Sequence, residues 1–166
     1  MNLNKLAFYV LICFVVIASC AKYSFRGALP SNLETLYIED IRDQTNYPGA
    51  RENFMQQLSI AFIADNSLII IEDKGAADLI LSGTITSVQR RPISIDPTEA
   101  VQQYQMVLTV KMECLNTHTD KPLWAQSISR YGIISGTALR DEIDQAILFA
   151  IEQIVEDIIS LTIGAW

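Results

Sequence analysis

The stretch YQMVLTVKMEC, residues 104–114, alternates between apolar and polar side chains. One face carries Tyr104, Met106, Leu108, Val110, Met112 and Cys114, and the other carries Gln105, Thr109, Lys111 and Glu113. A repeat of two residues is that of a β-strand, whose successive side chains point to opposite faces. Because one of these faces is polar, we expect the strand to lie in an antiparallel region with one face in water.

The segments on either side of this strand also have strand patterns. ADLILSGTITSVQ predicts a strand over 78–89, and RRPISIDPTEA connects it to the strand at 104–114. NTHTDKP, at 116–122, predicts a hairpin turn into LWAQSISRY, residues 123–131, which we expect to be the last strand of the sheet.

Upstream, the pattern changes from strand to helix and back. SNLETLYIEDI contains a predicted strand, and residues 50–64 place Phe54, Leu58, Ala61 and Phe62 at helical spacing after Pro48 and Gly49. The run SLIIIED, residues 67–73, then favours a strand that is buried on both faces. This order predicts a parallel strand pair with a right-handed crossover.

The C-terminal segment LRDEIDQAILFAIEQIVEDIISL predicts a long amphipathic helix. Its apolar stripe consists of Ile143, Ile147, Ala150, Ile154, Ile158 and Leu161. Asp141, Glu142 and Asp144 lie in its first turns, where the helix dipole favours negative charge. The predicted fold is of the α/β class (α+β type): a two-layer sandwich of a mixed sheet with four to five strands and two helices on one face, in the order β-α-β-β-β-α.

The N-terminus has the layout of a secretory signal. Lys5 is followed by an apolar run over 6–17, which is short for a helix that must cross a membrane. The residues IASC, ending at Cys20, resemble a lipobox, which predicts removal of residues 1–19 and acylation of Cys20. An ordinary signal peptide with an incidental cysteine, or an uncleaved anchor helix, would be the alternatives. Residues 20–33 would then form a lipidated tether and 34–166 a single domain.

Cysteine usage and charge limit the classes of function. Cys13 would leave with the signal, so Cys114 would be the one thiol left free, no internal disulfide could form, and we expect Cys114 to be a buried hydrophobe. Removal of Lys5 leaves 11 basic and 19 acidic side chains. A net charge of −8 makes nucleic acid an unexpected partner and gives no general attraction to anionic membranes.

The sequence offers little support for catalysis. His118 lies in the predicted hairpin turn without a second imidazole or cysteine nearby, and we expect it to be a solvated turn residue. The adjacent acid pairs, such as Glu39 with Asp40, point in different directions and do not converge on a substrate. No phosphate loop, nucleophile elbow or metal spacing is present. We therefore expect a binding protein without cofactor or metal; a small periplasmic hydrolase is the enzyme alternative.

A family resemblance follows from the residues after Cys20. AKYSFRG leads to Leu29-Pro30, and LYIEDIRDQT, NYPGARENFMQQLSIAFIADNSLII, AADLILSGTITSV, VQQYQMVLTVKMEC and KPLWAQSISRYG continue in order. The sequence resembles the LptE family of lipopolysaccharide-assembly lipoproteins over nearly all of its mature part. It departs from the family pattern at Ala21, where glycine is common, and in the DQT of 43–45.

The resemblance implies a lipoprotein of the outer membrane that faces the periplasm and is held there by acyl chains. Members of the family plug the β-barrel LptD and help it to insert lipopolysaccharide, so the implied partners are LptD and lipopolysaccharide. A lipid-anchored binding or scaffold module of another envelope complex is the alternative function.

Arg90 and Arg91 form the only pair of consecutive basic residues. Pro92 follows them in a predicted loop and favours an extended conformation at Arg91. At least one guanidinium group should then project outward, where it can bind a phosphate of the implied lipopolysaccharide ligand. The alternative is a solvated strand end whose arginines pair with Asp96 or Glu99.

Overall fold

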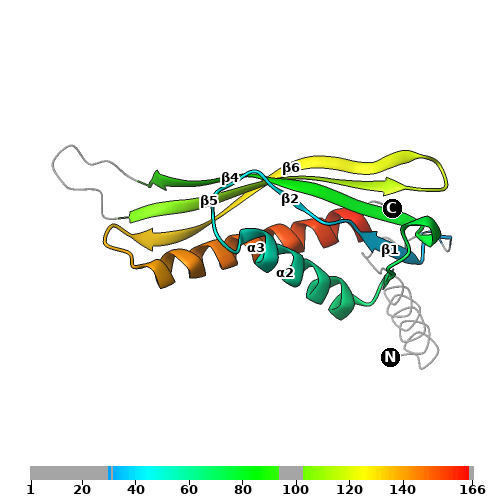
Figure 1. The fold of residues 1–166 in the computed structure, drawn as a ribbon, viewed down its shortest axis with the longest axis horizontal. Helices are drawn as coiled ribbons and strands as arrows, with labels where there is room; N and C mark the ends of the chain where they lie inside the picture. The colour runs from blue at the N-terminus through cyan, green and yellow to red at the C-terminus, as the bar shows by residue number, and fades with distance from the viewer. Residues whose placement is uncertain (1–29, 31, 94–102, 165–166) are drawn as a thin grey trace, which may run out of the picture.

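Three long strands form an antiparallel meander that runs the length of the molecule (Figure 1). The structure is a computed structural model that describes residue 30, residues 32–93 and residues 103–164. The strands are β4 (Leu79–Pro92), β5 (Gln103–Asn116) and β6 (Lys121–Ser135). Their existence and antiparallel pairing confirm the prediction, and the apolar face of β5 is the one that is buried.

Three short strands extend the sheet on the other side of β4. They are β1 (Thr35–Ile38), β2 (Arg42–Asp43) and β3 (Ile69–Ile70), and all of them pair in parallel. The strand order is β3-β1-β4-β5-β6, with β2 also paired to β4. The predicted parallel pair, β1 with β3, is confirmed.

Two details of the predicted sheet are wrong. The described part of the chain has six strands in the order β-β-α-β-β-β-β-α: β2 has no counterpart among the predicted segments, and the predicted order counted one strand fewer than those segments contain. The run at 67–73 is not buried on both faces. Since β3 lies at the edge of the sheet, the side chain of Ile69 stays 63% exposed.

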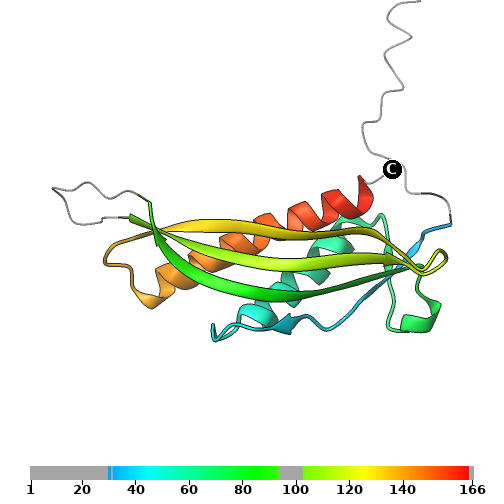
Figure 2. The same cartoon turned by 90° about the horizontal axis from the view of Figure 1, so that it is seen from above.

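Two helices cover one face of the sheet, as predicted (Figures 1 and 2). They are α2 (Ala50–Asp65) and α3 (Arg140–Ile163), and a short 3-10 helix, η2 (Lys74–Ala76), precedes β4. In α2 the predicted residues Phe54, Leu58 and Phe62 are fully buried. The buried side chains of α3 are Ala146, Ile147, Ala150, Ile151, Ile154, Val155, Ile158 and Thr162.

The buried surface of α3 is therefore wider than the predicted stripe. Ile143 and Leu161 of that stripe are only partly buried, whereas Ile151 and Val155 are buried although they lie outside it. The reason is that α3 packs against both the sheet and α2, so two sides of the helix lose their contact with water. The prediction considered one contact surface only.

Cys114 is fully buried between the sheet and the helices, which confirms its predicted role as a small hydrophobe. Burial raises the pKa of its thiol to about 12. The thiol is therefore neutral at every physiological pH, and its environment does not activate it as a nucleophile.

Asp78 ties together three segments at the start of β4. One carboxylate oxygen accepts hydrogen bonds from the backbone N–H groups of Glu34 and Thr35 and from the Thr35 hydroxyl, at 3.0, 2.9 and 2.7 Å. The other oxygen lies 2.8 Å from Nε2 of His118. The imidazole of His118 is half exposed in the β5–β6 turn, as predicted, but it also contacts Asp78, which the sequence did not indicate.

Replacing Asp78 with asparagine should destabilise the protein. The Thr35 hydroxyl, followed by the backbone N–H of Glu34, lowers the pKa of Asp78 from 3.8 to about 2. A carboxylate with a lowered pKa stabilises the fold above its unfolded value near 4, and this contribution disappears as the pH falls through about 2. We expect a loss of about 2 kcal/mol at pH 7 that shrinks between pH 4 and pH 2.

Urea unfolding of both proteins across that pH range would measure the difference. Asp120→Asn is the matched control, because Asp120 is exposed and its φ of 52° also suits asparagine. An unchanged unfolding midpoint for Asp78→Asn at pH 7 would contradict the prediction.

Candidate ligand-binding site at one end of the sheet

Arg90 and Arg91 lie at the end of β4, not in a loop as predicted. They pair with Met106 and Gln105 of β5, and Pro92 pairs with Tyr104. The strand continues to Pro92 because β5 provides pairing residues up to that point. The side-chain pattern of 78–92 alone does not show that these pairing residues are present, so the prediction ended the strand at Gln89. Both arginines are exposed.

Arg90 is held by two contacts on the helix side of the sheet. Its guanidinium group donates a hydrogen bond to the carbonyl of Gly136, with an N···O distance of 3.1 Å. It also lies over the ring of Tyr104, 3.8 Å from the ring centroid, which is a cation–π geometry. These contacts fix the position of the group, and neither of them is with an acidic side chain.

Arg91 is oriented by its neighbour on the same strand. Nε and one terminal nitrogen donate to the side-chain oxygen of Gln89, at 3.1 and 2.7 Å. Within the described residues, neither Arg90 nor Arg91 forms a salt bridge. The alternative partners Asp96 and Glu99 lie outside the described residues.

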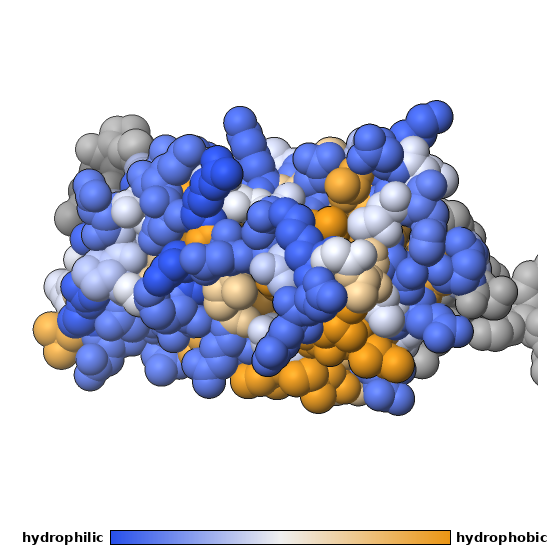
Figure 3. Space-filling view, turned by 45° about the vertical axis from the view of Figure 1, so that its right-hand side comes forward, coloured by the Kyte–Doolittle hydropathy of each residue, from blue (hydrophilic) through white to orange (hydrophobic). Residues whose placement is uncertain are grey.

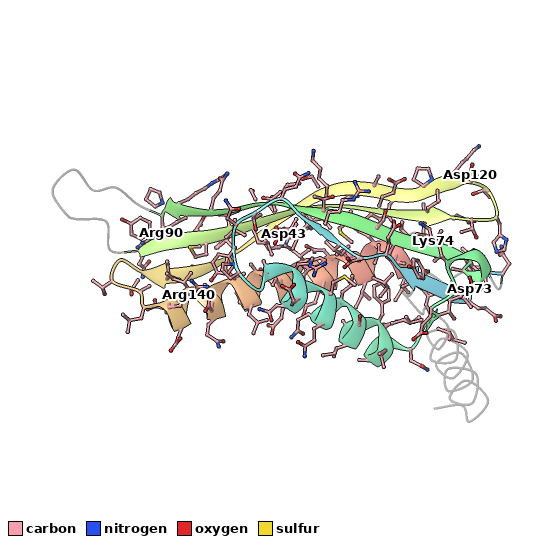
Figure 4. All side chains as sticks on the ribbon, in the orientation of Figure 1. Asp43, Asp73, Lys74, Arg90, Asp120 and Arg140 are labelled. Carbon is pink, nitrogen blue, oxygen red and sulfur yellow. The ribbon has the colours of Figure 1, made fainter. Side chains whose placement is uncertain are left out.

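A third arginine at the same end was not predicted from the sequence. Arg140 begins α3, and Figure 4 shows it at the end of the molecule that also carries Arg90. Its Nε lies 3.1 Å from both carboxylate oxygens of Asp144, so its charge is largely compensated. The sequence analysis considered the acids of the first helical turns, Asp141, Glu142 and Asp144. No pattern in the sequence distinguished Arg140, which precedes them.

Asp144 also accepts a hydrogen bond from the hydroxyl of Tyr47, which connects the β2–α2 loop to α3. Burial, together with this bond, raises the pKa of Tyr47 to about 12. The same bond, with help from Arg140, lowers the pKa of Asp144. Both groups therefore keep their protonation states at physiological pH. Tyr47, Asp144 and Arg140 together hold the start of α3 against the β2–α2 loop.

The described chain begins at the opposite end of the sheet from Arg90 and Arg91. The described chain begins at Pro30, whose carbonyl accepts a hydrogen bond from Leu33, and Leu36 of β1 pairs with Leu79 at the start of β4. Arg90 is eleven residues further along β4, about 35 Å away at the usual rise per residue. Figure 4 shows Arg90 at one end and Asp73, Lys74 and Asp120 at the other.

The open face of the sheet has a polar hollow of about 680 Å³ that Arg42 lines but Arg90, Arg91 and Arg140 do not. It is lined by residues that include Ser82, Thr84, Lys111, Glu113, Gln126 and Ser127. Across the described ranges, no group of three or more histidines, cysteines or acids could hold a metal ion. The hollow can therefore form hydrogen bonds, but the described residues place no metal-ligand cluster there.

The outer surface is mainly polar on the face that Figure 3 shows, and apolar side chains gather on the side where the helices lie. Among the exposed apolar residues are Ile60 and Ile63 of α2 and Phe149 of α3. No helix in the part of the chain that the structure describes is long and apolar enough to cross a membrane. Cys20, the predicted lipid attachment site, lies outside that part.

Comparison with known proteins identifies one family. The model of the LptE family, described as lipopolysaccharide-assembly, matches residues 33–162. No curated protein sequence matches the chain.

Solved structures share the fold at low sequence identity. Protein XCC0632 from Xanthomonas campestris has a TM-score of 0.62 and 9% identity, covering 83% of this chain and 88% of the other. Protein CT253 from Chlamydia trachomatis has a TM-score of 0.61 and 9% identity, with 80% and 96% covered. Uncharacterized lipoprotein B from Nitrosomonas europaea has a TM-score of 0.54 and 15% identity, with 82% and 89% covered. At such identities these structures support the fold and no particular activity.

Proposed function

The chain belongs to the LptE family of lipopolysaccharide assembly, and from this premise we propose that it is an outer-membrane lipoprotein that plugs and supports the LptD barrel. In this role the domain faces the periplasm, is held to the membrane by acyl chains on Cys20, and contacts lipopolysaccharide through Arg90 and Arg91. Residues 1–19 are removed as a signal peptide.

The observation that carries this proposal is the position of the two ends of the domain. The first described strand, β1, pairs with β4 at Leu79, and the two arginines, which have no acidic partner among the described residues, lie about 35 Å away at the other end of β4. A lipid-anchored plug needs this separation, because one end must stay at the membrane surface while the other reaches along the barrel. Ten residues connect Cys20 to Pro30, which span at most about 35 Å.

The proposed role as a plug of the barrel requires no catalytic residues. Two of the acids that the sequence presents as an adjacent pair have structural partners: Glu39 lies 2.8 Å from Lys74, and Asp40 lies 3.0 Å from Arg51. Both pairs are solvent-exposed. These contacts support the proposal that the protein binds and positions its partners without chemistry of its own.

Isolation of the complex would test the proposal. The full-length chain with a C-terminal tag, purified from outer membranes in mild detergent, should retain the LptD barrel at a fixed ratio. Depletion of the protein should reduce barrel maturation and the amount of lipopolysaccharide at the cell surface. Unchanged lipopolysaccharide transport after depletion, or a stable complex with a different envelope protein, would contradict it and favour the scaffold alternative.

Charge reversal at the arginine end should weaken lipopolysaccharide binding. An arginine fork binds phosphate oxygens through two charge-assisted hydrogen bonds, and glutamate would repel the same group. We expect Arg90→Glu with Arg91→Glu to lower the affinity at least tenfold in a titration at fixed salt. Because Arg90 also contacts Gly136 and Tyr104, the double variant should lose a little thermal stability, whereas Arg91→Glu alone should lose almost none.

Lys121→Glu is the control for net charge and is compared with Arg91→Glu alone, because each changes the charge by two units and Lys121 begins β6 at the other end of the domain. Equal loss of affinity in this variant would mean that overall charge, and not a site, governs binding. Unaltered binding in the double variant would remove both arginines from the site.

A further inference from the structure

The strand β6 is one edge of the sheet, and its outer side has no strand partner within the described residues. A groove of about 570 Å³ lies along this edge near the arginine end. Residues 131–133 form its strand wall, and Glu142, Gln145, Ala146, Phe149 and Gln153 of α3 form its helix wall. Tyr131, Ile133 and Phe149 are 45%, 57% and 55% exposed.

Three side-chain contacts reveal which backbone groups of β6 point toward this edge. The carbonyls of Ser129 and Tyr131 accept hydrogen bonds from the side chains of Arg130 and Gln153, and the N–H of Ser135 donates to Glu142. In an antiparallel strand both backbone groups of a residue point to the same side, and successive residues alternate. The β5–β6 register is uninterrupted from Cys114 back to Gln103, so the odd-numbered residues of β6 point outward.

It follows that, between the carbonyl of Ser129 and the N–H of Ser135, three outward groups remain without a partner in the described part of the chain. They are the N–H of Tyr131 and the N–H and C=O of Ile133. The side chain of Gln153 occupies the C=O of Tyr131, which lies between these free groups, and Glu142 occupies the N–H of Ser135 beyond them. An added β-strand pairs with backbone donors and acceptors on alternate residues of an edge strand, as at Tyr131 and Ile133.

The walls of the groove provide apolar contact for both faces of such a strand. Tyr131 and Ile133 have their side chains on the open face of the sheet, because the even-numbered neighbours Gly132 and Ile134 face the helices and are buried. Phe149 lies on the helix side. An added strand would therefore contact Ile133 with one residue and Phe149 with the next.

From this geometry we propose that an extended, apolar segment of the LptD chain adds to the free edge of β6 at Tyr131 and Ile133. The proposal rests on the function proposed above, which supplies the partner. It commits to a segment without acidic residues, because Glu142 is the only charged side chain among the described residues that line the groove. The groove lies at the arginine end, which is the part of the domain that a lipid-anchored plug places farthest from its anchor.

Residue-resolved hydrogen exchange on the full-length protein tests this pairing. The amides of Tyr131 and Ile133 should exchange rapidly in the free protein and at least tenfold more slowly in the complex with LptD. The amide of Ser127, which also points outward on β6 but lies outside the groove, should remain fast. Rapid exchange at Tyr131 and Ile133 in an intact complex would overturn the inference and leave the proposed function standing.

A proline substitution provides the second test. Ile133→Pro removes an outward N–H without removing a hydrogen bond to β5, and proline is tolerated at such edge positions. It should weaken the complex at least tenfold, whereas Ser127→Pro should not.

Two other outcomes of the exchange experiment would overturn the inference. Protection of the two amides in the protein alone would indicate pairing with a second copy, and protection in detergent micelles without LptD would indicate contact with lipid. If no LptD copurifies with the wild type, the proposed function fails and this inference fails with it.

Discussion

Cys20→Ser is expected to abolish attachment to the outer membrane. The sequence IASC follows a signal-length apolar run, and serine cannot accept the thioether-linked lipid that a lipobox cysteine carries. Each buried methylene of an acyl chain contributes about 0.8 kcal/mol, so stable anchoring requires more than one chain. The described domain has no helix that could replace this anchor. Nearly all of the variant should therefore disappear from the outer-membrane fraction.

Two measurements check this expectation. The intact mass of the wild type should correspond to a chain that begins at Cys20 and carries acyl groups. Density-gradient fractionation should find the variant as an uncleaved precursor in the inner membrane or as released protein. Cys114→Ala is the control. Cys114 is buried in the core and is not the predicted lipid attachment site, so this variant should remain in the outer membrane. A wild-type protein that still begins at Met1 and has no lipid would contradict the prediction.

The fold could be predicted largely from local patterns. The alternation in residues 104–114 fixed both the strand and its buried face, and helical spacing located α2 and α3 to within a few residues. The parts that were missed are those without a local pattern. β2 is two residues long and exists because Arg42 and Asp43 pair with Thr84 and Ile85 of a distant segment.

The candidate site shows the same limit more strongly. Arg90 and Arg91 could be selected because they are consecutive cations in an acidic chain. Their real environment depends on Tyr104, Gly136 and Gln89, and two of these residues reach them only through the folding of β5 and β6. The free backbone groups at Ile133 could not be predicted either, because they follow from the edge position of β6, which is a property of the whole sheet.

Gly132 is a further position whose importance only the tertiary structure reveals. It lies in β6 where the backbone of α3 at Ala146 comes close to the strand. A Cβ atom there would lie 2.3 Å from the carbonyl oxygen of Ala146 and 2.6 Å from its Cα atom. Both are backbone atoms, so no side-chain rotation can relieve the contact. The helix would have to move away from β6, the element that it contacts most.

Gly132→Ala should therefore destabilise the protein by about 3 kcal/mol, which is at the upper end of the usual cost of overpacking. The cost is high because moving α3 away from β6 also opens gaps among the buried side chains of Ile128, Ile147 and Ile151. Thermal or urea unfolding would measure the loss. Gly75→Ala is the matched control. Its Cβ would meet only the side chain of Asp73, at 3.3 Å, in the exposed 3-10 helix η2, and the stability of the protein should change by less than about 0.5 kcal/mol. If both variants unfolded at the wild-type midpoint, the close packing of α3 on β6 would be contradicted, and with it the position of the helix wall beside the free edge.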